Sequence, residues 1–185
     1  MKRWWLTLAL AMPFAGWHTP LIAQRNLEIE VKAAFLYNFL SFIEWSPAAF
    51  AKSDAPLNVC VIGGDPFALA LDAVVRNERI SGHPVVVDRI KDESQISGCH
   101  ALYVPALDET PLVSIMRAAN RRNLLVVGES RRVLELCGTI AFVLDGERVR
   151  FDINRSSLAA RNLKANSKLL RVAREASDRF GHCEH

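Results

Sequence analysis

Four cysteines are the residues of this chain whose chemistry depends most on where the protein works. Cys60, Cys99, Cys137 and Cys183 allow three complete pairings in an oxidising compartment. A structural zinc site would need closely spaced ligand pairs such as CxxC, and the sequence has none. We therefore expect disulfides and no bound metal.

The histidines do not point to catalysis. His83 lies in a turn signal and His100 at a strand start, and neither has an identifiable Ser or Asp partner. The segment Gly63–Pro66 stands where a phosphate loop would stand, yet it matches neither GxGxxG nor GxxxxGK[ST]. Its Asp65 would also place a carboxylate where an anion would bind. We expect a protein that is not an enzyme and needs no cofactor.

The N-terminus predicts the compartment. Lys2 and Arg3 precede the apolar run Trp4–Ala15, and small residues follow near Ala23. This order of basic, apolar and small residues is typical of a secretory signal peptide. The run is shorter than the roughly 20 apolar residues that span a bilayer. We predict that residues 1–23 are a cleaved signal peptide and that the protein works outside the cytoplasm.

The remaining residues, 24–185, fit one domain of common size. The formal net charge of the whole chain is +3, and loss of the signal peptide removes two of its basic residues. Arg121–Arg122 and Arg131–Arg132 are isolated basic pairs on a mixed surface. No nucleic-acid partner is therefore expected.

The hydrophobic pattern positions these residues on alternating strands and helices. Apolar residues recur at three- and four-residue steps over Asn26–Trp45, which predicts a first helix capped by Asn26. Strands are predicted at Leu57–Ile62, Val85–Ile90, Ala101–Val104 and Asn123–Val127, with helices beginning at Asp65–Pro66 and spanning Thr110–Asn120. This alternation predicts an α/β fold with a mostly parallel central sheet and helices on both faces.

The last third of the sequence predicts a C-terminal β-hairpin and a closing helix. Strands Thr139–Leu144 and Arg148–Ile153 flank the turn signal Asp145–Gly146. The second strand alternates, so that one of its faces is buried and the other is wet or occupied. Asn154 is expected to cap the next helix, and the closing helix is expected over Leu163–Ala176.

This arrangement favours one disulfide. Cys60 lies inside the first predicted strand and Cys99 lies immediately before the third. Neighbouring parallel strands bring such positions within bonding reach, so we expect a Cys60–Cys99 disulfide. The alternative is that all the thiols are free or buried.

Five sequence blocks, taken in order, resemble the YfiR family. They are Glu30–Phe39 continuing to Trp45, Cys60–Phe67, Cys99–Val104, Arg148–Asn154 and Ser167–Ala173. The resemblance implies a periplasmic α/β regulator that binds the periplasmic sensor domain of an inner-membrane diguanylate cyclase and represses it. Cyclic di-GMP and biofilm formation would then be limited, and an outer-membrane lipoprotein would draw the repressor away. The alternative is a periplasmic small-ligand or redox-sensing module without a cyclase partner.

The resemblance also bears on particular residues. Cys60 and Cys99 match the family's central disulfide, and Cys137–Cys183 is a second candidate pair. Cys137 lacks the nearby second cysteine that some relatives have.

Three further residues are candidates for a polar or partner contact. Arg150 is expected either to form an ion pair with Glu44 or near Asp152, or to contact an acidic partner, and Trp45 adjoins Glu44. The first helix is also more apolar than one buried face needs, so we expect an exposed edge that supports partner docking or a homodimer.

Overall fold

A mixed α/β sheet organises the protein. The computed structural model describes residues 21–63, 66–181 and 183. The expected signal peptide up to residue 20, the Asp65 cap and the terminal histidines lie outside these residues. The described strands of the main sheet are β2 (Leu57–Ile62), β3 (Arg79–Ile80), β4 (His83–Ile90), β5 (Ala101–Val104), β6 (Leu125–Gly128), β7 (Ile140–Asp145), β8 (Arg148–Asn154) and β10 (Glu175–Ser177).

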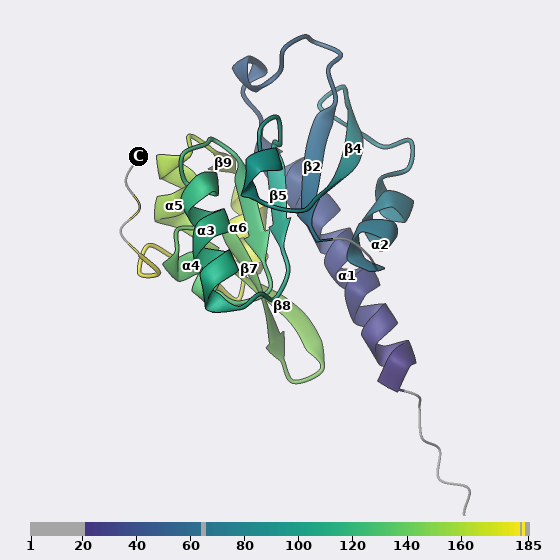
Figure 1. Cartoon of the computed structure of the whole chain (residues 1–185), viewed down its shortest axis with the longest axis vertical. Coiled ribbons are helices and arrows are strands. Elements are labelled where there is room, and N and C mark those ends of the chain that lie inside the picture. Colours follow the sequence, from purple (N-terminus) through teal and green to yellow (C-terminus); the bar gives the residue numbers. More distant parts are fainter. Residues whose placement is uncertain (1–20, 64–65, 182, 184–185) are drawn as a thin grey trace, which may run out of the picture.

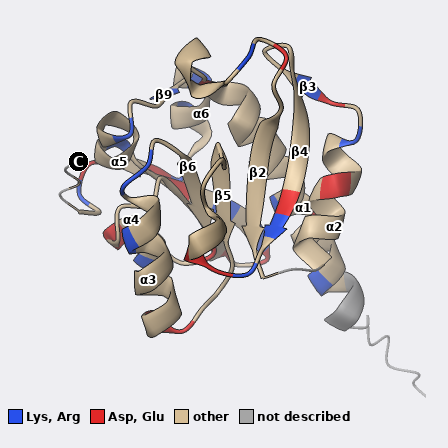
Figure 2. Ribbon diagram, turned by 45° about the horizontal axis from the view of Figure 1, so that its top comes forward, with Lys and Arg blue, Asp and Glu red and all other residues tan. Residues whose placement is uncertain are grey.

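The strand order across this sheet is β10-β8-β7-β6-β5-β2-β4-β3. Strands β4, β2, β5, β6 and β7 run parallel to one another, whereas β3 pairs antiparallel with β4, and β7 and β8 form an antiparallel hairpin. The mostly parallel sheet and the C-terminal hairpin are therefore confirmed. The inner strands β5 and β6 contain no charged residue (Figure 2), as expected for strands covered on both faces.

Helices cover both faces of the sheet (Figure 1). On one face lie α1 (Leu21–Phe42) and α2 (Pro66–Val75), and on the other lie α3 (Glu109–Ala119) and α4 (Arg131–Glu135). The shorter α5 (Arg155–Ala160) and α6 (Ser167–Val172) follow the hairpin, and two 3-10 turns, η1 (Pro47–Ala49) and η2 (Glu93–Gln95), lie in loops. None of the described helices combines the length and the apolar character that a membrane span requires.

The larger core cluster lies under α1. Phe39 is 1% exposed, and its ring lies 4.7 Å from that of Phe151 and 5.7 Å from that of Phe142, measured between centroids. Phe35 packs against the same rings and is only partly buried. Leu36 is fully buried, while Tyr37 is partly exposed and donates a hydrogen bond to Glu78 at 2.8 Å. The helix therefore supplies the aromatic centre of the domain.

The first helix differs from its predicted bounds. It begins before Asn26, so this residue is not its cap, and it ends at Phe42 rather than Trp45. The next residues form the short strand β1 (Ile43–Glu44), which pairs antiparallel with β9 (Lys164–Ala165). Backbone pairing with a distant segment ended the helix where the local apolar pattern would have continued it.

The long closing helix expected over Leu163–Ala176 is wrong in its bounds. This segment divides into β9, the short helix α6 and the edge strand β10. The Asn166 side chain accepts a hydrogen bond from the Lys168 backbone N–H at 2.9 Å and so caps α6, which begins just after β9 ends. Asn154 caps α5 as predicted, because its side chain accepts from the Ser157 N–H at 3.1 Å.

Candidate interaction site

A groove separates the N-terminal half of α1 from the β7–β8 hairpin. Both segments extend beyond the rest of the domain in Figure 1. The groove has a volume of about 470 Å³. Its apolar lining comes from both walls: Leu27, Val31 and Phe35 on α1, and Leu144 and Val149 on the hairpin.

The two walls leave large apolar side chains in water. Leu27 is 60% exposed and Leu144 is 59% exposed. Leu27 continues the apolar spacing of the helix, but it lies on the turns of α1 that extend beyond the rest of the domain (Figure 1). Single exposed leucines are ordinary, but two that line one groove form an apolar patch of the kind that binds partners.

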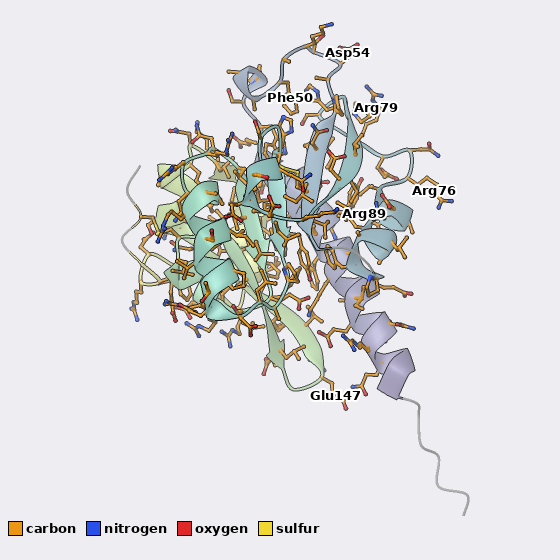
Figure 3. The ribbon with its side chains drawn as sticks, viewed as in Figure 1. Phe50, Asp54, Arg76, Arg79, Arg89 and Glu147 are labelled. Atoms are coloured by element: carbon orange, nitrogen blue, oxygen red, sulfur yellow. A yellow bond between two sulfur atoms is a disulfide. The ribbon has the colours of Figure 1, made fainter. Side chains whose placement is uncertain are left out.

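Basic side chains border this apolar patch. Arg148 and Arg150 of β8 line the groove and are exposed. Within the described residues neither forms an ion pair, whereas Glu28 on the opposite wall is paired with Lys32 at 2.6 Å. Glu147, at the tip of the hairpin, is labelled in Figure 3. The guanidinium groups are thus available to a carboxylate from outside the chain.

The predicted contact residues do not all meet here. Arg150 lies opposite Val143 in the hairpin, whereas Glu44 lies after the far end of α1 and pairs in register with Lys164. The predicted Arg150–Glu44 ion pair does not form among the described residues, because the length of α1 separates the two side chains. Trp45 adjoins Glu44, and its indole N–H donates to the Leu40 carbonyl at 2.9 Å.

Trp45 instead lines a second cavity, of about 640 Å³, at the other end of the domain. His100, Cys99 and Arg161 line the same cavity. Cys60 and Cys99 are joined in the structure, with their Cα atoms 5.8 Å apart. This disulfide ties β2 to the loop that precedes β5.

Cys137 and Cys183 form the second disulfide of the structure, with Cα atoms 5.6 Å apart. Cys137 has a φ of +64°, in the left-handed region, and ends the turn after α4. The following Gly138 packs so closely against Val133 that a Cβ there would lie 2.3 Å from its side chain. The Cys137–Cys183 disulfide therefore holds the C-terminal tail against the turn after α4.

Sequence reasoning missed two buried ionic groups. Asp152 is fully buried and accepts from Arg174 Nε at 2.8 Å, with Arg131 at 3.9 Å. Lys32 is also buried and bridges Glu28 and Glu129, the latter at 3.1 Å. The strand alternation did place Asp152 on the polar face of β8, but its partners come from segments far along the chain.

Arg161 is a third buried ionic group, and it acts as a cap. Its guanidinium donates to the carbonyls of Ala119 and Arg122, both at 2.9 Å, at the C-terminal end of α3. Burial lowers the pKa of Arg161 to about 10. Carbonyls at a helix C-terminus favour a cation, so Arg161 joins α3 to α5.

Together these features describe an α/β domain with an exposed apolar groove bordered by arginines. Comparison with known proteins identifies the family: residues 29–174 match the YfiR/HmsC-like family, and the chain belongs to it. Members of this family are periplasmic regulators of cyclic di-GMP signalling rather than enzymes.

A solved structure shares the fold. It is the crystal structure of a conserved domain protein from Vibrio cholerae O1 biovar El Tor, which is similar to this chain with a TM-score of 0.52 and 11% sequence identity. The match covers 80% of this chain and 60% of that one. At this identity the likeness shows the fold alone.

Proposed function

We propose that this protein is a periplasmic repressor of an inner-membrane diguanylate cyclase. It binds the periplasmic sensor domain of the cyclase and thereby limits cyclic di-GMP and biofilm formation. The observation that carries this proposal is the family match over residues 29–174. The two disulfides also suit an oxidising compartment.

The groove between α1 and the hairpin is the surface that we assign to the cyclase. Leu27 and Leu144 would enter an apolar pocket on the sensor domain, while Arg148 and Arg150 would face acidic side chains at its rim. Repression then needs only that the protein binds the inactive state of the sensor domain better than the active one.

A gene-deletion experiment tests the function. Cells that lack the gene should contain more cyclic di-GMP and form more biofilm, and the wild-type gene should restore both. Leu144→Asp should fail to restore them, whereas Leu69→Asp, on α2 and 63% exposed, should succeed as a matched surface control. Unchanged cyclic di-GMP in the deletion strain would contradict the proposal.

A second candidate function rests on one observation. The Cys60–Cys99 disulfide adjoins the cavity of about 640 Å³, which suits a small-ligand or redox-sensing module without a cyclase partner. The same deletion strain separates the two functions, because this alternative predicts no change in cyclic di-GMP.

A further inference from the structure

The loop of residues 46–56 forms one wall of the cavity that Trp45 lines, and few hydrogen bonds hold it in place among the described residues. Ser46, Ala49 and Ala55 of this loop line the cavity, and Phe50 and Asp54 are labelled on it in Figure 3. Its backbone hydrogen bonds are internal, such as that from the Ala55 N–H to the Lys52 carbonyl at 3.1 Å.

Two histidines attach this loop to the domain. His100 Nε2 lies 3.0 Å from the Ala49 carbonyl, and His83 Nδ1 lies 2.7 Å from the Ala55 carbonyl. Among the described residues, these are the hydrogen bonds that join the loop to the rest of the chain. The Phe50 ring stacks between the two imidazoles, with centroid distances of 3.5 Å to His83 and 4.7 Å to His100.

The hydrogen bonds define how each histidine is protonated. A carbonyl only accepts, so Nε2 of His100 and Nδ1 of His83 each carry a proton. The backbone N–H of Asn58 donates to Nδ1 of His100 at 3.1 Å, so that nitrogen must be unprotonated. A proton added to Nδ1 of His100 would set its N–H against the backbone N–H of Asn58, and the hydrogen bond between them would be lost. A proton added to His83 leaves its bond to Ala55 intact.

The charges around the pair do not favour protonation of His100. The titratable and charged groups nearby are His83 across Phe50, Arg79 on β3, Lys52 and Asp54 in the loop, and Arg161 in the cavity wall. Within the described residues no carboxylate forms an ion pair with either imidazole. Burial lowers the pKa of His100, the bond to Ala49 opposes this, and the charge of a protonated His83 lowers it further.

We propose that His83 and His100 form a pH-sensitive clamp on the loop of residues 46–56, with His100 as the sensing member. At neutral pH both histidines hold the loop in place as a wall of the cavity. On acidification His100 takes up a proton at Nδ1, the bond from the Asn58 N–H is lost, and the imidazole turns away and releases the Ala49 carbonyl of the loop. The direction follows from linkage: a histidine whose pKa is lowered in the closed state stabilises that state above its ordinary pKa and ceases to do so as the pH falls.

Hydrogen exchange of the full chain between about pH 8 and about pH 5 tests the clamp, since an imidazole titrates in this range. After correction for intrinsic rates, protection of residues 46–56 should be constant at the upper end. Below the ordinary imidazole pKa it should fall about tenfold per pH unit until the lowered pKa is reached. Protection of β5 and β6 should not change.

Two matched variants identify the sensing member. His100→Gln keeps a donor for Ala49 and an acceptor for Asn58 but does not titrate, so its loop should stay protected at every pH. His83→Gln should loosen the loop at every pH and retain the response to acid. A wild-type loop whose protection does not depend on pH, or a response that survives in His100→Gln, would overturn the proposal.

A measurement on the wild-type chain keeps the test independent of variant folding. The imidazole of His100 should titrate, by nuclear magnetic resonance, at the pH where the loss of loop protection levels off. A titration midpoint clearly away from that pH would also overturn the clamp.

Discussion

At the scale of single residues, the same kind of side chain has opposite roles at the two ends of the domain. Arg161 is buried and its donors are occupied by backbone carbonyls, whereas Arg150 is exposed beside an apolar groove. Sequence alternation identified Arg150 as polar-facing. It could not show that Arg161 is buried, because its acceptors come from α3, about forty residues earlier.

Arg150→Ala tests whether this residue faces a partner. The free energy of unfolding should change by less than about 0.5 kcal/mol, since an exposed side chain without an ion pair contributes little. Binding of the sensor domain should weaken and lose part of its salt dependence. Urea denaturation and titration at two salt concentrations give both quantities. Lower stability with unchanged affinity would indicate a structural role instead.

Phe39→Ala tests the aromatic centre under α1. Phe39 is 1% exposed and packs on Phe142 and Phe151. Its truncation should lower the free energy of unfolding by about 3–5 kcal/mol. Urea denaturation measures this loss, and Leu69→Ala on the exposed side of α2 is the control, with little expected change. A loss below about 1 kcal/mol would show that Phe39 is not a core residue.

At the scale of elements, prediction succeeded where local pattern decides the structure. The strands Leu57–Ile62 and Ala101–Val104 have the bounds that their apolar runs predicted. The prediction of a long closing helix failed. Glu175–Ser177 instead joins β8 through backbone pairing and the Arg174–Asp152 contact, and local periodicity reveals neither. The groove was missed for a similar reason: the exposure of Leu27 depends on where the hairpin ends.

The Cys60–Cys99 disulfide belongs to this scale, because it closes a loop between two elements. The two cysteines are 39 residues apart, so the cross-link should stabilise the domain by about 4 kcal/mol in the chain-entropy model. The double variant Cys60→Ala/Cys99→Ala should lose about that much in urea denaturation. Peptide mapping of periplasmic protein that finds both thiols free would contradict the prediction.

At the scale of the whole molecule, the two candidate surfaces lie at opposite ends. The groove beside the hairpin would bind the cyclase, while the loop that contacts His83 and His100 forms a wall of the other cavity. Helix α1 leads from one to the other, with its N-terminal half in the groove and Trp45 just beyond its C-terminal end.

The central claim is that this protein binds the periplasmic sensor domain of a diguanylate cyclase through the groove. The most direct test is calorimetric titration of the full chain with the purified sensor domain of a cyclase encoded beside its gene. We predict saturable binding that Leu144→Asp weakens at least about a hundredfold, as loss of a central interface residue costs several kcal/mol. Leu69→Asp should bind like the wild type. Absence of binding, or equal weakening by both variants, would contradict the account.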